Sequence, residues 1–88
     1  MSYLYILQSV KNSSYYIGST INLKNRLKQH RQGEAKYTRL ILPVKLVFFQ
    51  RFSSLKLARR AEAWLKKQKD RGLIKRIIRD GKLNKCFS

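Results

Sequence analysis

Apolar side chains alternate with a period of two near the start of the chain and follow helical spacing further on. Residues 3–8, "YLYILQ", are rich in aromatic and branched side chains and predict a β-strand. Residues 15–18, "YYIG", predict a second strand, and the turn-forming "SVKNSS" between them predicts an antiparallel hairpin. Period-two spacing divides the first strand into two faces, with Tyr3, Tyr5 and Leu7 on one and Leu4 and Ile6 on the other.

The middle of the chain predicts a helix, a loop and a third strand. Thr20 or Asn22 can cap a helix over residues 22–32, which Gly33 would end. The segment "QGEAKYTR" has the composition of a loop. After Pro43, residues 44–52, "VKLVFFQRF", are strongly β-prone and predict the third strand.

Two helices are predicted for the remainder. Ser53 or Ser54 can cap a long helix that runs to about Lys69. Its apolar stripe consists of Leu55, Ala58, Ala61 and Leu65. Gly72 is expected to break this helix, and residues 73–81, "LIKRIIRDG", predict a short, basic last helix.

The element order is therefore β-β-α-β-α-α, and we expect an α+β fold with one three-stranded antiparallel sheet flanked by helices. With 88 residues there is room for a single core. We assign one domain to residues 1–82 and a short, frayed C-terminal tail to residues 83–88.

Charge is the unusual feature of the composition. Twenty-one Lys and Arg face four acidic residues, which gives a formal net charge of +17. Such a surplus favours a polyanionic partner, with nucleic acid first and a membrane surface second. With only four carboxylates in the chain, a site that needs three or four of them is excluded.

The sequence lacks a membrane-spanning segment, a secretory signal and a second cysteine, and these three absences bear on where the protein is located. No apolar run approaches the ~20 residues that cross a bilayer, and the N-terminus lacks the pattern of a secretory signal. Cys86 is the only cysteine, so no intramolecular disulfide can form. We expect a cytoplasmic protein that does not insert into a membrane.

Arg26 and His30 are the first candidates for chemistry. They are four residues apart on the predicted helix and share a face beside Leu23 and Leu27, at the rim of the core. Arginine offers a forked donor for phosphate oxygens, and histidine can hydrogen-bond a nucleophile or a leaving group. The alternative is a solvated basic face that carries a surface histidine.

Glu62 is the second candidate, because it lies at the edge of the apolar stripe of the long helix. A carboxylate beside the core needs a cationic partner. Lys66, four residues on, can form a salt bridge with it. A divalent metal is the other partner, since Mg²⁺ needs only one or two carboxylates when a substrate phosphate supplies oxygen.

Tyr5 and Tyr16 are the third, because they lie on the two strands of the predicted hairpin. Gly18, two residues after Tyr16, would let the backbone or a substrate approach closely. Aromatic packing within the sheet is the alternative, and for Tyr3 and Tyr15 it is the preferred interpretation. The sequence shows no zinc-ligand spacing, glycine-rich phosphate loop, Ser-His-Asp set or glycosidase carboxylate pair.

Together these residues resemble the GIY-YIG nuclease family over residues 3–80, nearly the whole chain. The second tripeptide of the family is intact as Tyr16-Ile17-Gly18, and the first is present as Tyr3-Leu4-Tyr5, with Tyr3 in place of the glycine. Further matches, at the family's spacing and in its order, are Arg26, His30, Glu62 and the "AKYTR" segment at 35–39. The chain is most similar to the small stand-alone bacterial branch, and it also resembles the N-terminal catalytic domain of the excision-repair nuclease.

The resemblance implies phosphodiester hydrolysis with one Mg²⁺ or Mn²⁺ ion held by Glu62. It assigns the scissile phosphate to Arg26, and the attacking water to Tyr5 or Tyr16 together with His30. A tyrosine can act as the base only if Arg26 and the metal lower its pKa. Expected DNA contacts are Gly18, Lys24, Lys28, Arg31, Lys36, Arg39, Arg59 and Lys66.

We therefore expect a DNA endonuclease with weak sequence specificity, selective for structures such as flaps, nicks or branches. A monomer that nicks one strand is expected, with two copies needed for a double-strand break. Two alternatives stay open: a basic nucleic-acid-binding module without activity, and a ribosome-associated or RNA-packing protein.

Overall fold

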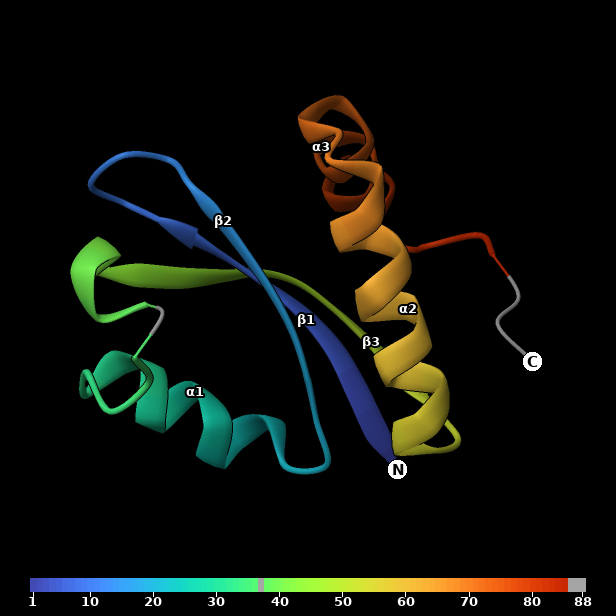
Figure 1. The fold of residues 1–88 in the computed structure, drawn as a ribbon, viewed down its shortest axis with the longest axis horizontal. Helices are drawn as coiled ribbons and strands as arrows, with labels where there is room; N and C mark the ends of the chain where they lie inside the picture. The colour runs from blue at the N-terminus through green and yellow to red at the C-terminus, as the bar shows by residue number, and fades with distance from the viewer. Residues whose placement is uncertain (37, 86–88) are drawn as a thin grey trace.

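The sheet is built around its first strand. In the computed structural model, which describes residues 1–36 and 38–85, β1 (Ser2–Ser9) pairs antiparallel with β2 (Tyr15–Thr20) on one side and β3 (Val44–Phe52) on the other. The strand order is β2-β1-β3. The predicted α+β class and the order β-β-α-β-α-α are confirmed (Figure 1). A short 3₁₀ turn, Arg39–Ile41, precedes β3 where a loop was predicted.

The first helix, α1 (Leu23–Arg31), begins and ends where the sequence predicts. The Asn22 side chain accepts a hydrogen bond from the Asn25 amide at 3.0 Å and so caps the free amides of the first turn. Gly33 follows the last turn with a φ of 75°, a left-handed conformation that glycine adopts without strain.

The other two helices are α2 (Leu55–Gln68), capped by Ser54, and α3 (Arg71–Asp80). The predicted break at Gly72 is wrong, because Gly72 lies in the first turn of α3. The chain turns earlier, where Lys69 adopts a left-handed φ of 50° and the Asp70 carboxylate accepts a hydrogen bond from the Leu73 amide. Cap formation by Asp70, rather than the flexibility of glycine, sets the boundary.

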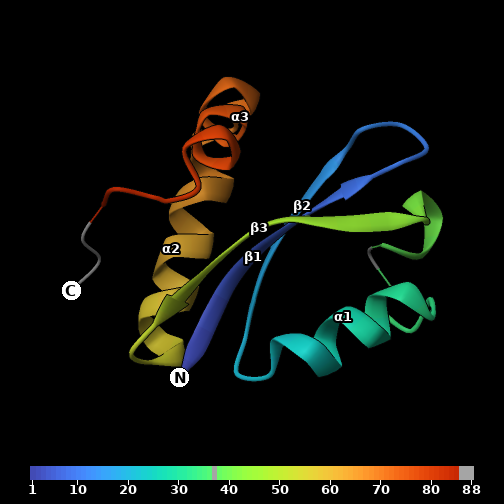
Figure 2. The same cartoon turned by 180° about the vertical axis from the view of Figure 1, so that it is seen from behind.

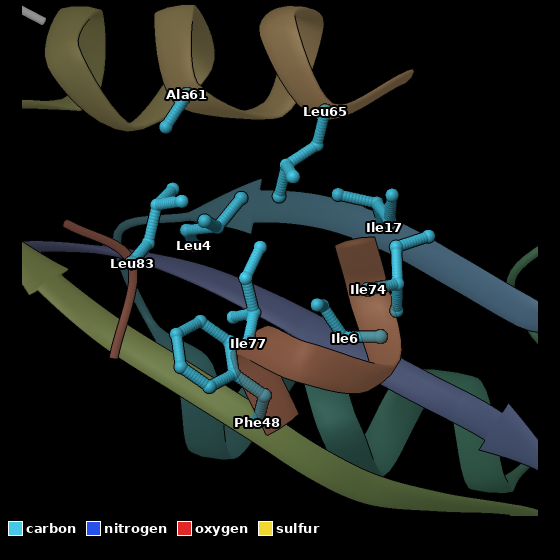
Figure 3. Close-up of a cluster of buried hydrophobic side chains, with 9 residues drawn as sticks. All are labelled: Leu4, Ile6, Ile17, Phe48, Ala61, Leu65, Ile74, Ile77 and Leu83. Atoms are coloured by element: carbon cyan, nitrogen blue, oxygen red, sulfur yellow. The ribbon is translucent and has the colours of Figure 1, made fainter. Parts of the chain in front are cut away.

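Helices cover both faces of the sheet, with α1 on one face and α2 and α3 on the other (Figures 1 and 2). On the second face, apolar side chains of the sheet and of these two helices point toward one another and form the core (Figure 3). Its members are Leu4, Ile6, Ile17, Phe48, Ala61, Leu65, Ile74, Ile77 and Leu83.

Leu83 corrects the expected tail, which was placed at residues 83–88. Its side chain is buried in the core, and its amide donates to the Gln50 Oε1 at 2.8 Å. Cys86 and the last two positions lie outside the described residues. Within 1–36 and 38–85, every helix is too short or too polar to cross a membrane.

Candidate active site

A buried chain of hydrogen bonds lies between β1 and α1, on the face of the sheet opposite the apolar core. The Tyr5 hydroxyl lies 2.9 Å from His30 Nε2, and His30 Nδ1 lies 2.7 Å from Thr38 Oγ1. Because the Thr38 hydroxyl donates to the Ala35 carbonyl at 3.5 Å, we assign the imidazole proton to Nδ1, which donates to Thr38. His30 Nε2 then accepts a hydrogen bond from the Tyr5 hydroxyl.

His30 lies deeper than the sequence indicated. We expected it at the rim of the core or on a solvated face, but its exposed fraction is 0%. Burial is tolerated because Tyr5 and Thr38 satisfy both ring nitrogens. Burial, together with the nearby charge of Arg26, lowers the pKa of His30, so the ring is neutral at pH 7.

Tyr5 is held as a neutral phenol. Burial raises its pKa to about 12, although hydrogen bonding to Arg26 and the Arg26 charge act in the opposite direction. We expected Arg26 to lower the pKa of a catalytic tyrosine. At Tyr5 it does act in that direction, but desolvation raises the pKa by more.

Gly18 makes room for this tyrosine. The two residues face each other in the β1–β2 register, and a Cβ atom at Gly18 would lie 2.5 Å from the Tyr5 hydroxyl oxygen. Gly18 is itself buried. The close approach predicted from the sequence is real, but the Tyr5 ring, not a substrate, occupies the space, so a DNA contact at Gly18 is not supported.

Tyr16 and Arg26 lie at the outer side of this buried chain. The Tyr16 ring centroid is 5.1 Å from that of His30 and 6.3 Å from that of Tyr5, and Tyr16 is only half-buried. The Arg26 guanidinium donates to Gln29 Oε1 at 3.0 Å. Its pKa is raised first of all by hydrogen bonding to the Tyr5 hydroxyl, so the guanidinium is always charged.

Glu62 approaches from the opposite side of the edge strand β2. Its Oε1 accepts a hydrogen bond from the Ser19 hydroxyl at 2.5 Å, and its Oε2 pairs with Lys66 Nζ at 2.6 Å. The salt bridge anticipated from the i, i+4 spacing is thus present. Lys66 Nζ also lies 5.9 Å from the centre of the Tyr16 ring, which links Glu62 to the tyrosines.

The Glu62 carboxylate fits a metal ion that takes most of its ligands from water and substrate. Among the described residues no three His, Cys, Asp or Glu side chains come together, so a multi-ligand cage is absent from that part of the chain. Ser19 orients one carboxylate oxygen, and the other is shared with Lys66, whose side chain is 52% exposed and can be displaced. Mg²⁺ can be held by one carboxylate when water and substrate supply the other ligands.

A groove runs beside the end of β2, between α1 and the start of α2. It has a volume of about 530 Å³. Its lining residues are Ser19, Thr20, Ile21, Asn22, Asn25, Arg26, Gln29, Leu55 and Arg59. Two expected phosphate contacts, Arg26 and Arg59, therefore line the same space, which is large enough for a sugar-phosphate unit.

The remaining cations predicted as DNA contacts are exposed and lie mostly along α1 and the segment after it. Lys24, Lys28 and Arg31 line a second hollow, of about 470 Å³, on the outer side of α1. Lys36 is exposed, and the exposed Arg39 donates from Nε to the Gly33 carbonyl at 3.0 Å. These residues form a basic surface next to the groove and not inside it.

Ser19 and Thr38 are site residues that the sequence analysis missed. Ser19 follows Gly18 and so points to the other face of β2, where α2 lies. Thr38 belongs to the "AKYTR" segment, which was singled out only as a family match. Neither residue carries a charge or a regular spacing that would have marked it, since each acts by orienting another side chain.

The fold, with polar side chains gathered on both sides of its edge strand β2, is that of the GIY-YIG class. Residues 1–76 match the GIY-YIG catalytic domain, and the chain belongs to this family.

The relatives are small proteins of similar length. The chain is 48% identical over 69 residues to a UPF0213 protein of Streptococcus pneumoniae serotype 4, covering 77% of this chain and 69% of the relative. It is 45% identical over 71 residues to a UPF0213 protein of Streptococcus pyogenes serotype M3, covering 80% and 76%. The solution NMR structure of a UPF0213 protein from Bacillus halodurans is 36% identical, with a TM-score of 0.56 and coverage of 92% and 87%.

Proposed function

We propose that this chain is a metal-dependent endonuclease that hydrolyses DNA phosphodiester bonds with weak sequence specificity. The observation that carries the proposal is the placement of Glu62, which Ser19 holds by a hydrogen bond and whose partner Lys66 lies over the ring of Tyr16, next to His30. A protein that only binds nucleic acid has no need of a carboxylate there, because it would repel phosphate. Selectivity for flaps, nicks or branches, as in repair or recombination, is part of the proposal.

Arg26 is proposed to bind the scissile phosphate. It lines the groove, its charge is permanent, and the Gln29 side chain fixes one nitrogen of its fork. A preoriented guanidinium stabilises the negative charge that accumulates on the phosphate oxygens in the transition state.

Glu62 is proposed to hold one Mg²⁺ or Mn²⁺ ion through Oε2 after Lys66 moves aside. With the ion bound, the site gains a Lewis acid that stabilises the charge on the leaving 3′ oxygen. Ser19, which lines the groove, would hold the carboxylate in place by its hydrogen bond to Oε1. The displaced Lys66 ammonium remains near Tyr16 and is available to a neighbouring phosphate.

The two tyrosines are proposed to differ in role. Tyr5 is buried, has a pKa of about 12 and donates to His30, so it is a positioning residue that fixes the imidazole. Tyr16 is half-buried and lies between His30 and Lys66, and is therefore the tyrosine that can contact the attacking water. His30 is neutral and adjacent to the ring.

One observation favours a second candidate function, a nucleic-acid-binding module without activity. In the structure Lys66 neutralises the Glu62 carboxylate, and the two charged residues that line the groove, Arg26 and Arg59, are both basic. Such a module would bind DNA with steep salt dependence and would need no metal. Preference for structured RNA over duplex DNA would instead indicate the RNA-packing role.

A cleavage assay separates these functions. Supercoiled plasmid and labelled branched DNA are incubated with the protein in Mg²⁺, Mn²⁺ or EDTA, with Glu62→Gln as the matched control. Glu62→Gln keeps the shape of the side chain and an acceptor for Ser19 but removes the charge. The proposal predicts metal-dependent nicking that the variant lacks while it still binds DNA. Tight, salt-sensitive binding without cleavage in any metal would establish the binding module.

A further inference from the structure

Charged side chains follow the edge strand β2 from one end to the other. Helix α2 runs antiparallel to β2, so Arg59 lies at the groove near Thr20, Glu62 contacts Ser19, and Lys66 lies over Tyr16. Arg59, Glu62 and Lys66 are spaced i, i+3, i+7 and so share one face of the helix. The first residue of α3, Arg71, continues this row.

Arg71 is held in place at the far end of the row from Arg59. Its guanidinium lies 4.8 Å from the centre of the Tyr15 ring, and one of its terminal nitrogens donates to the Ser13 carbonyl at 3.0 Å. Stacking on an aromatic ring orients the planar fork, and Ser13 takes only one of its five N–H donors. Arg71 is exposed, so the rest of the fork is accessible to a ligand.

We infer that Arg71, stacked on Tyr15, is a second phosphate-binding contact for the nucleic-acid strand that passes the site, on the opposite side of Glu62 from Arg59. A preoriented, exposed fork is the donor arrangement that suits a phosphate. The inference rests on the proposed function, because it takes the strand to lie along β2. Tyr15 packs against the apolar core, as the sequence predicted, and the ring also carries the guanidinium of Arg71.

The length of the row fixes how many nucleotides it can span. Six residues of extended strand, Tyr15–Thr20, cover about 17 Å at ~3.4 Å per residue. At ~3.4 Å of rise per nucleotide of one strand, this corresponds to about five nucleotides. Glu62 contacts Ser19 and Arg71 contacts Tyr15, four residues further back along β2, so Arg71 should be reached only by substrates that extend about four nucleotides from the cleaved bond on one side.

The test is the affinity of Arg71→Ala for DNA oligonucleotides in EDTA, so that binding is measured without cleavage. The oligonucleotides are shortened from the 5′ side or from the 3′ side of a nick. Arg76→Ala is the matched control, because it removes one positive charge from the exposed side of the same helix. Arg71→Lys keeps the charge but loses the planar fork, and thermal unfolding of every variant checks the fold.

For long DNA, Arg71→Ala is expected to bind about tenfold more weakly than wild type and to lower the salt slope of binding by about one. Arg71→Lys should recover part of the affinity, and Arg76→Ala should change little. Shortening the DNA on one side, but not on the other, should make wild type and Arg71→Ala equal.

An equal loss on long and short DNA would show that Arg71 only fastens α3 to the hairpin, and would overturn the inference. So would a loss no larger than that of Arg76→Ala. A length-dependent loss in a protein that cuts no DNA would support the inference and count against the nuclease. Absence of any DNA binding by wild type would overturn both.

Discussion

The two faces of β1 are both buried, but one is covered by apolar side chains and the other by hydrogen-bonded polar side chains. Leu4 and Ile6 face α2 and α3 and pack among apolar side chains (Figure 3). Tyr5 faces α1 and meets His30, whose ring is equally buried but entirely hydrogen-bonded. Apolar burial drives folding, whereas a satisfied polar cluster fixes the orientation of its members. The comparison indicates that one face supplies most of the apolar burial, whereas the other holds the tyrosine and histidine of the candidate site.

Truncating the apolar face should have the largest effect on stability. Leu65→Ala removes a fully buried side chain from the centre of the core and should lower the free energy of unfolding by about 2–5 kcal/mol. Urea unfolding followed by circular dichroism measures this, with exposed Lys67→Ala as the control, expected to change it by less than about 0.5 kcal/mol. A loss below about 1 kcal/mol for Leu65→Ala would contradict the assignment of the core.

Gly18→Ala tests how closely the side chains are packed on the face of β1 and β2 that α1 covers. The added Cβ would come within 2.6 Å of the Tyr5 ring carbon that carries the hydroxyl, so the ring must move away from His30. We expect a loss of about 1–3 kcal/mol in urea unfolding, together with a loss of cleavage. An alanine variant as stable and as active as wild type would show that the position of the Tyr5 ring does not depend on the space left by Gly18.

Tyr5→Phe and Tyr16→Phe should separate positioning from chemistry. Tyr5→Phe leaves His30 Nε2 buried without its partner and should cost about 1–3 kcal/mol of stability. Tyr16→Phe should change stability by less than about 0.5 kcal/mol but slow single-turnover cleavage by a factor of about 10²–10⁴. If Tyr5→Phe cost no stability, or Tyr16→Phe left the rate intact, the proposed division of roles would be wrong.

The pH dependence of stability is the smallest effect that we expect. Because burial lowers the pKa of His30 in the folded state, the unfolded chain takes up a proton more readily. The His30 contribution is therefore complete above the unfolded pKa of about 6.5 and is lost as the pH falls below it. Urea unfolding between about pH 7.5 and 5.5 should show a decline that is weaker in His30→Gln. An identical slope in both proteins would exclude His30 as its source.

Local sequence signals were sufficient for the elements and singled out most of the residues of the candidate site. Alternating periodicity located β1, and helical periodicity located α2. For each of the first two helices the sequence offered two cap residues, and one of the two, Asn22 for α1 and Ser54 for α2, is the observed cap. Glu62 was identified because a carboxylate beside an apolar stripe needs a partner. These features depend on neighbours within a turn or two of the chain.

Two of the three errors concern contacts between distant segments. His30 is buried because Tyr5 and Thr38, 25 and 8 residues away, satisfy its nitrogens. Leu83 is ordered because Gln50, on β3, binds its amide. Gly72 was predicted to be a break because the Asp70 cap was overlooked. In the first two, tertiary packing decides a position that local periodicity leaves open.

The central claim is that Glu62, at the edge between the two faces, makes the polar face a metal site. Electron paramagnetic resonance of Mn²⁺ titrated into the protein, with an uncleavable oligonucleotide present, tests this most directly for wild type, Glu62→Gln and Lys66→Met. The account predicts one bound Mn²⁺ in wild type, none in Glu62→Gln, and tighter binding in Lys66→Met, where no ammonium competes for Oε2. Equal Mn²⁺ binding by wild type and Glu62→Gln would contradict it.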